Sequence, residues 1–306
     1  MRAAIVVAVL SCAAGVAACA PRVPTGGPAP APEGADAAST DIYLYRLGGI
    51  PLLTRGDLAN LTQRRGYDNQ PMWDGRDRLL YTSQHQGQTD IYAVDFESAT
   101  IQRLTETPES EYSPAPTPDG AAITVVRVER DSTQRLWRFP RHGGAPDVIL
   151  PDLKPVGYFA WLDTARLALF VLGSPNALHI GDANTGVTRV VAHGIGRSLQ
   201  RVPGSRRASF LHRSGASWVL KTVEASPAGG EVRIDSIAVM PDSAEYVVWR
   251  SATELYTAAG SRILRLRLPG EAWEQVADLG AEGIRGISRL ALSPDGRRLA
   301  FVAQEP

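Results

Sequence analysis

Cysteine is nearly absent from this sequence of 306 residues. Its two cysteines, Cys12 and Cys19, both lie in the first nineteen residues. Residues 20–306 therefore contain no thiol, which excludes a disulfide framework from that long segment. A fold built from it must be held together by packing and hydrogen bonds.

An excess of charge of either sign is also missing. Acidic and basic residues number 32 each, and the sequence has no long run of like charge. Lys154 and Lys221 are the two lysines, and the arginines are spread over all segments. This distribution excludes the basic stripe of a nucleic-acid-binding protein, so we predict no nucleic-acid partner. With 44% hydrophobic residues, the chain suits a globular fold with a substantial core.

Common catalytic motifs are missing as well. The sequence has no G-x-S-x-G for a hydrolase nucleophile, no H-E-x-x-H for zinc and no phosphate-binding P-loop. The five histidines follow no metal-binding spacing, and the glycines of HGIGRS (193–198) have the wrong spacing for a nucleotide loop. We therefore predict a protein without catalytic residues, metal or cofactor.

The amino terminus has the pattern of an exported protein. Met1 and Arg2 precede an apolar run over 3–18, which is shorter than the roughly 20 residues of a membrane span. The end of this run, VAAC at 16–19, resembles a bacterial lipobox, in which the cysteine is acylated and becomes the mature terminus. We predict a signal peptide over 1–18 and lipidation of Cys19. An ordinary signal peptide cleaved nearby is the alternative.

Residues 19–40 are predicted to be a tether between the lipid anchor and a folded body. The segment is rich in Ala, Pro and Gly, and proline keeps such chains extended. The predicted location is the bacterial cell envelope, with the protein anchored to a membrane and facing the periplasm. Ala20, directly after the cysteine, favours the outer membrane.

From residue 41 onward, one pattern recurs: an extended segment, a tight turn and a β-branched run. It is clearest in SPAPTPDGAAITVVRVE (113–129) and SPDGRRLAFVA (293–303), where proline and glycine suit a type I turn followed by a left-handed residue. Six copies align on their turns, and successive turns are 41 to 47 residues apart. This is the period of a four-stranded propeller blade. The aligned turn positions are Gly75, Gly120, Thr164, Ser205, Ala252 and Gly296.

The two ends of the folded body look like halves of one blade. The last hairpin has no third or fourth strand after it, whereas DIYLYRL (41–47) and LANLT (58–62) have no hairpin before them. Pairing the two ends would complete a sixth blade and remove free sheet edges. We predict an all-β, six-bladed β-propeller over 41–306, closed by N-terminal strands that complete the last blade. Six unrelated hairpins in a sandwich, the alternative, would leave the orphan segments unexplained.

These repeats resemble the WD40-like repeats of the TolB-like six-bladed β-propellers. The resemblance rests on SPDGRRLAFV, TPDGAAITVV and the DIY and RLT segments that follow the hairpins, and it covers Asp41 to Ala303. It implies the propeller fold. TolB itself carries a separate α/β domain before its propeller and binds the peptidoglycan-associated lipoprotein. Because a tether alone precedes the ring here, we expect a lipoprotein form that lacks that domain.

Propellers usually bind ligands at the mouth of the central channel, where the innermost strands begin. The aligned copies place polar and aromatic side chains there. Tyrosine and arginine are frequent in binding hot spots, so we predict that a monomer binds an envelope protein, a peptide or a polar polymer such as a glycan. The predicted mouth residues are Asn69, Gln70, Tyr112, Ser113, Tyr158, Arg197, Ser198, Tyr246, Ser288 and Arg289.

Two other interpretations of the mouth stay open. In the first, these side chains merely solvate the funnel. In the second, the propeller is a metal-dependent enzyme of the lactonase or lyase type, which needs carboxylates, histidines or asparagines converging from several blades. Asp68 and Glu111 lie near the mouth, but two acids without a metal-ligand set are weak grounds for catalysis. The residue types at the mouth favour binding.

Overall fold

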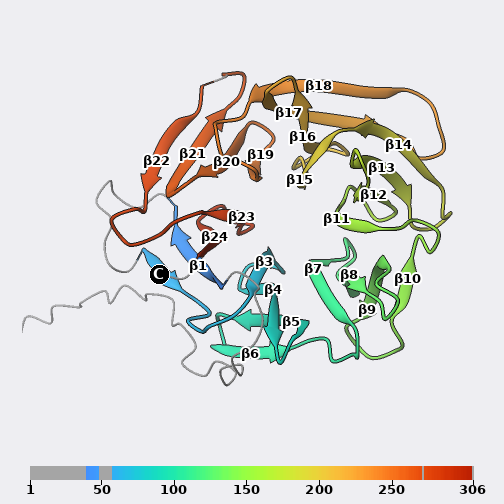
Figure 1. Cartoon of the computed structure of the whole chain (residues 1–306), viewed down its shortest axis with the longest axis horizontal. Helices are drawn as coiled ribbons and strands as arrows, with labels where there is room; N and C mark the ends of the chain where they lie inside the picture. Colours follow the sequence, from blue (N-terminus) through green and yellow to red (C-terminus); the bar gives the residue numbers. More distant parts are fainter. Residues whose placement is uncertain (1–38, 48–56, 271, 305–306) are drawn as a thin grey trace, which may run out of the picture.

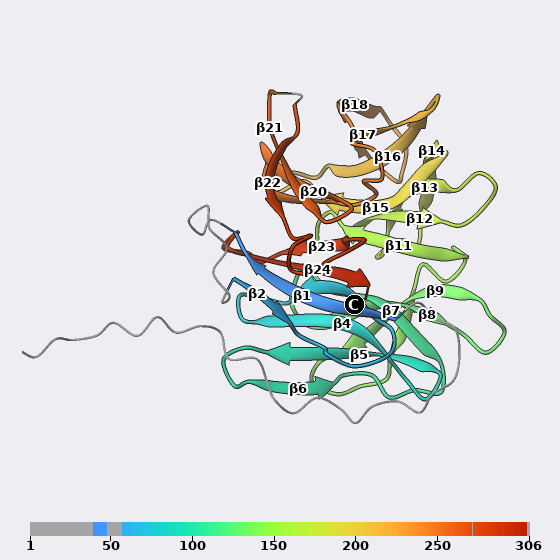
Figure 2. The ribbon, with the colours of Figure 1, turned by 60° about the vertical axis from the view of Figure 1, so that its left-hand side comes forward.

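A computed structural model describes residues 39–47, 57–270 and 272–304. In these residues, twenty-four strands form six four-stranded sheets. Figure 1 shows the sheets arranged as blades around a common centre, and Figure 2 shows the same ring tilted. The predicted six-bladed β-propeller is therefore confirmed.

Five blades each come from consecutive residues, with neighbouring strands antiparallel. Their innermost strands, which face the centre in Figure 1, are β3, β7, β11, β15 and β19. The first blade consists of β3 (Asp68–Trp73), β4 (Arg78–His85), β5 (Gln88–Asp95) and β6 (Thr100–Arg103). The second consists of β7 (Ser110–Pro116), β8 (Ala122–Val128), β9 (Gln134–Pro140) and β10 (Asp147–Ile149). The third consists of β11 (Val156–Trp161), β12 (Arg166–Val171), β13 (Ala177–Asp182) and β14 (Thr188–His193). The fourth and fifth consist of β15 (Ile195–Arg201), β16 (Ala208–Ser214), β17 (Ser217–Ala225) and β18 (Val232–Val239); and β19 (Val247–Ser251), β20 (Glu254–Ala259), β21 (Arg262–Arg267) and β22 (Glu274–Asp278).

The sixth blade combines strands from both ends of the described chain. Its order is β2 (Leu58–Asn60), β1 (Thr40–Arg46), β24 (Arg298–Gln304) and β23 (Ser288–Leu292). Strands β1 and β24 pair over seven residues, from Thr40 opposite Gln304 to Arg46 opposite Arg298. The N-terminal strands thus supply the two strands that the last hairpin lacks.

In the second and sixth blades, the turn between the first and second strands follows the chemistry that the sequence predicts. In the sixth blade, the Ser293 hydroxyl donates to Asp295 Oδ1 at 2.6 Å, and the amide of Arg297 donates to the same oxygen at 3.1 Å. Gly296 follows with a φ of 69°, and Gly120 takes the equivalent place in the second blade with a φ of 71°. Only glycine adopts this left-handed conformation without strain, so the turn is encoded locally.

The core lies between neighbouring blades. Five successive residues of β12, Leu167–Val171, are buried, because each blade packs against a neighbour on both faces. The outermost strands are more exposed, as β6 shows with three exposed residues out of four. This arrangement fixes the innermost strands on a rigid scaffold around the channel.

Tryptophans of three innermost strands tie alternate blades to the preceding blade. Each indole N–H donates a hydrogen bond across a blade boundary. The three bonds run from Trp73 Nε1 to the Ala291 carbonyl at 3.1 Å, from Trp161 Nε1 to Thr124 Oγ1 at 3.1 Å, and from Trp249 Nε1 to Ser209 Oγ at 2.8 Å.

The predicted signal peptide over 1–18, Cys19 and the tether as far as residue 38 lie outside the described residues. Within the described part of the chain, no helix has the length and apolar character that a membrane crossing requires.

Candidate functional site

The innermost strands carry backbone irregularities near one end of the channel. The register of β3 shifts between Asn69 and Met72, and β7, β11, β15 and β23 shift at corresponding places. In three of these blades a residue inside the irregular stretch adopts a left-handed conformation: Gln70 (φ 56°), Ser113 (φ 52°) and Arg289 (φ 50°). A β-bulge re-aims side chains and is often found beside functional sites. Here the bulges turn side chains of several blades toward the channel.

Two cavities meet at this end of the channel. The inner cavity has a volume of about 80 Å³ and receives residues from all six innermost strands or the residues just before them. The outer cavity has a volume of about 330 Å³ and includes Tyr67, Tyr112 and Leu172 in its lining. Both are lined by Gln70, Tyr158 and Arg197. We call the layer formed by Gln70, Tyr158, Arg197, Tyr246 and Arg289 the channel mouth.

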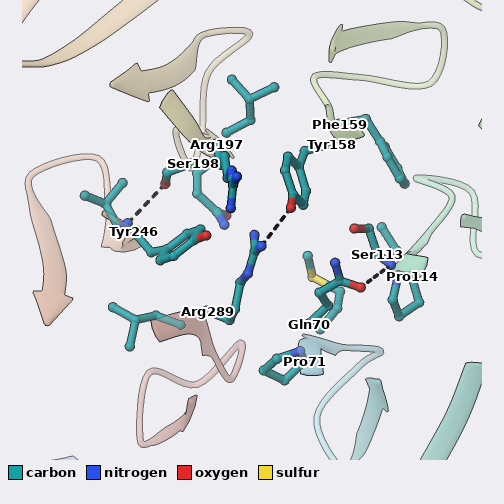
Figure 3. A pocket seen from close by; sticks show the side chains of 16 residues that line it. Gln70, Pro71, Ser113, Pro114, Tyr158, Phe159, Arg197, Ser198, Tyr246 and Arg289 are labelled. Atoms are coloured by element: carbon teal, nitrogen blue, oxygen red, sulfur yellow. Dashed lines mark hydrogen bonds between the residues drawn. The ribbon is translucent and has the colours of Figure 1, made fainter. Parts of the chain in front are cut away.

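Arg289 crosses the mouth between two tyrosine rings. It comes from the sixth blade and donates from Nη2 to the hydroxyl oxygen of Tyr158 in the third blade, at 2.7 Å. Its guanidinium carbon lies 4.6 Å from the ring centre of Tyr158 and 4.4 Å from that of Tyr246. Figure 3 shows the side chain extending toward Tyr158 in the middle of the cavity. Such contacts are cation–π interactions, which hold a guanidinium in a fixed orientation.

Burial or neighbouring groups raise the pKa values of three side chains at or beside the mouth: Arg289, Tyr246 and Tyr67. Burial disfavours the charged guanidinium of Arg289, but the nearby Tyr158 and Tyr246 outweigh this and raise its pKa above the ordinary value. Burial also raises the pKa of Tyr246 and of Tyr67. At neutral pH Arg289 is therefore protonated and lies near the neutral phenols of Tyr246 and Tyr67.

Most of the predicted mouth residues lie together. Two of them also link blades: Gln70 Oε1 accepts from the Ser113 amide at 2.8 Å, and Ser198 Oγ accepts from the Val247 amide at 3.1 Å. The predicted residues that line the inner cavity are Gln70, Ser113, Tyr158, Arg197, Ser198, Tyr246 and Arg289.

Three predicted residues lie elsewhere. Tyr112 lines the outer cavity. Asn69 and Ser288 are not among the lining residues of these two cavities. The Asn69 amide nitrogen lies 3.4 Å from Thr40 Oγ1, so this side chain contacts the N-terminal strand.

Tyr67 belongs to the site although the repeat alignment omitted it. It lines the outer cavity, and its ring meets that of Tyr112 edge to face with centres 6.5 Å apart. Tyr67 directly precedes β3, and alignment of the hairpins on their turns predicts mouth residues of this blade only at Asn69 and Gln70. Its signal in the sequence was a tyrosine immediately before an innermost strand.

The two carboxylates near the mouth each form an ion pair with an arginine. Asp68 Oδ1 accepts from Arg64 at 2.7 Å, and Glu111 Oε1 accepts from Arg127 at 3.0 Å. Both acids are fully buried. Across the described residues, no group of three or more His, Cys, Asp or Glu is placed to hold a metal ion.

Comparisons with known proteins add the following findings. No family model matches the chain. It is 32% identical over 103 residues to a Protein TolB homolog of Chlorobium chlorochromatii, a match that covers 32% of this chain and 22% of the relative. The match thus spans about a fifth of that relative's length.

Solved structures resemble the chain over a larger part of its length. The structure of a putative TolB from Agrobacterium tumefaciens superposes with a TM-score of 0.67 at 14% identity, over 89% of this chain and 100% of that chain. TolB from Acinetobacter baumannii gives a TM-score of 0.50 at 19% identity, over 64% of this chain and 48% of that chain. At these identities the likeness establishes the fold.

Proposed function

The chain has the fold of a TolB-like six-bladed β-propeller, and on that premise we propose that it is a non-catalytic envelope lipoprotein whose channel mouth binds a protein, a peptide or a polar polymer. The observation that carries the proposal is the convergence of Tyr158, Arg197, Tyr246 and Arg289, from four different blades, around two connected cavities.

The chemistry of these side chains suits binding. Tyrosine offers a large rigid surface with a hydroxyl group, and arginine offers several hydrogen-bond donors in a fixed plane. Arg197 is exposed, whereas Tyr158 and Tyr246 are half-buried. A ligand entering the outer cavity would thus meet an exposed cation first and the aromatic rings next.

The envelope part of the proposal is supported by the sequence before residue 41. It rests on the apolar run, the VAAC motif and the Pro- and Ala-rich segment after Cys19. The similarity to a protein named as a TolB homolog agrees with a role in the envelope.

The binding proposal is tested by capture from envelope extracts with the full chain as bait. Wild type, Tyr158→Ala, Arg197→Ala and Arg206→Ala are compared by quantitative mass spectrometry, and the affinity for each captured ligand is then measured. Arg206 is the matched control because it is an exposed arginine of the same blade as Arg197, in the turn between β15 and β16. Truncation of a hot-spot residue costs about 2 kcal/mol or more, roughly thirtyfold in affinity.

We expect Tyr158→Ala and Arg197→Ala to weaken the captured ligand while Arg206→Ala does not. Each variant must keep the wild-type melting temperature, because Tyr158 also packs on Phe170 with ring centres 5.5 Å apart. Loss of affinity in Arg206→Ala alone would place the partner at the end of the ring that carries the turn between β15 and β16. Lactone-opening or lyase activity that depends on an added divalent ion and on mouth residues would replace the binding proposal with the enzymatic alternative.

The anchoring proposal is tested separately with Cys19→Ala. Wild type should incorporate labelled palmitate and partition into the detergent phase, because acyl chains anchor a protein to the membrane. Cys19→Ala should do neither and should accumulate as an unprocessed or released form. Wild-type protein that carries no label would refute lipidation at Cys19.

A further inference from the structure

Arg289 is a partly buried cation without an acidic partner among the described residues. Two arginines with largely buried side chains have such a partner: Arg64 pairs with Asp68 at 2.7 Å, and Arg127 pairs with Glu111 at 3.0 Å. By contrast, the ion pairs found within 4.0 Å among the described residues include neither Arg289 nor Arg197. The mouth thus holds two guanidinium groups and no carboxylate bound to them.

This arrangement is unusual on physical grounds. A charge removed from water is normally paired, because its lost hydration must be replaced. The tyrosine rings of Tyr158 and Tyr246 replace part of it, but a cation–π contact is worth only about 0.5–2 kcal/mol. Arg289 lines the inner cavity, so a ligand there can reach its remaining N–H groups.

Further donors and acceptors around Arg289 are available. Because Tyr158 accepts a hydrogen bond from Arg289, its own O–H remains available as a donor. Ser113 also lines the inner cavity, and its hydroxyl oxygen is buried without a hydrogen-bond partner. The site therefore offers a planar cation, a phenol donor and an unpartnered serine in one small space.

We propose that the channel mouth receives a carboxylate group of an acidic peptide, with Arg289 and Arg197 as its charge partners and Tyr158 O–H as a hydrogen-bond donor. This inference rests on the proposed binding function and specifies its ligand class. The planar fork of an arginine matches a carboxylate in geometry. The inner cavity of about 80 Å³ has room for such a small group, and the outer cavity of about 330 Å³ has room for the peptide that carries it.

The experiment is calorimetric titration of the purified full chain with three tetrapeptides at low salt. The probes are acetyl-tetraglutamate amide, acetyl-tetraglutamine amide and acetyl-tetraglutamine with a free carboxyl terminus. The first and third distinguish a side-chain carboxylate from a terminal one. We expect at least one carboxylate probe to bind about tenfold or more tightly than the neutral probe, the effect of one charge-assisted hydrogen bond.

Variants locate the binding. Arg289→Met retains an unbranched side chain of similar length without charge, and it should reduce the affinity of the carboxylate probe about tenfold or more. Arg197→Ala should reduce it less, about threefold to tenfold, because Arg197 is exposed and its charge is screened. Arg206→Ala should leave it unchanged. Unfolding curves of each variant separate loss of binding from loss of folding.

Two results would overturn the carboxylate inference. If the neutral and acidic probes bind equally and Tyr158→Ala weakens both, the mouth is a binding site without charge selection, and the proposed function stands. If none of the three probes binds while capture still depends on Tyr158, the ligand is of another class. Loss of mouth dependence in the capture experiment would instead remove the proposed function itself.

Discussion

At the scale of single residues, Asp68 shows how burial can outweigh an ion pair. Its side chain is fully buried at the start of β3 and accepts hydrogen bonds from Ser83 at 2.6 Å and Arg64 at 2.7 Å. Its other oxygen, Oδ2, has no hydrogen-bond partner. Burial raises the pKa of Asp68 to about 6, although Arg64 and Ser83 act to lower it. The folded protein therefore binds a proton at this site more readily than the unfolded chain does.

This shift predicts a pH dependence of stability. Because the folded pKa is above the unfolded value, the contribution of Asp68 is fully present below about pH 4 and is lost as the pH rises through about 6. A shift of about two pKa units corresponds to roughly 3 kcal/mol. Asp68→Asn removes the titration, so the free energy of unfolding of wild type minus that of the variant should fall by up to about 3 kcal/mol between pH 4 and pH 7.

Denaturant unfolding at several pH values measures this difference. The exposed Asp152→Asn is the control and should leave the wild-type profile in place. A constant difference between wild type and Asp68→Asn over this range would show that Asp68 does not titrate there.

The sequence predicted which residues reach the mouth better than how they meet. Tyr158, Tyr246 and Arg289 were found because the distance from the tight turn to the mouth is nearly constant among blades. The bond between Arg289 and Tyr158 joins opposite blades 131 positions apart, and no local pattern encodes it. The distance from the turn does not fix which side chain faces the channel, because strand alternation shifts by one residue at a bulge: Gln70 lines the inner cavity, whereas the neighbouring Asn69 does not.

At the scale of elements, the blades differ in the side-chain hydrogen bonds that fix their innermost strands and turns. The innermost strands of the first, third and fifth blades carry a tryptophan that donates to the preceding blade. The turns of the second and sixth blades are instead fixed by the hydrogen-bonded pairs Thr117 with Asp119 and Ser293 with Asp295. These two turns were predictable because their chemistry is local. The tryptophan contacts were not, because their acceptors lie on a separate sheet.

The bond between Trp249 and Ser209 gives a prediction for this scale. Both residues are buried, so Ser209→Ala leaves the indole N–H without its acceptor and should cost about 1–3 kcal/mol of unfolding free energy. In a double-mutant cycle with Trp249→Phe, the coupling should be about 0.5–1.5 kcal/mol. Strictly additive costs would mean that the bond contributes nothing to holding the fourth and fifth blades together.

At the scale of the whole molecule, the ring depends on the pairing of β1 with β24. Ile42, Tyr43 and Leu44 of β1 are buried, and the Tyr43 ring stacks on Phe301 with centres 5.6 Å apart. Thr40 also bridges to Tyr67, so β1 supports the first blade at the edge of the channel mouth. The orphan segments of the sequence were sufficient to predict this blade because each was a recognisable half of the repeat.

A chain that begins at Gln63 tests this dependence. It loses both N-terminal strands and exposes the edge of β24, so it should aggregate and melt lower by more than about 10 °C, the effect of losing several kcal/mol of buried side chains. Deletion of residues 20–38 is the matched control and should leave the melting temperature unchanged. Equal melting temperatures for the Gln63 chain and the full chain would contradict a stabilising role for β1 and β2.

The composition of the sixth blade from both ends of the described chain also affects folding during translation. Strand β1 is synthesised before every other described strand and its partner β24 after them, about 260 residues later. At roughly 5–20 residues per second, translation leaves β1 without its partner β24 for about 13 to 50 seconds. The other five blades contain no such gap and can form as their residues emerge. Until the last hairpin (β23 and β24) has been synthesised, β1 therefore remains available for pairing with another chain.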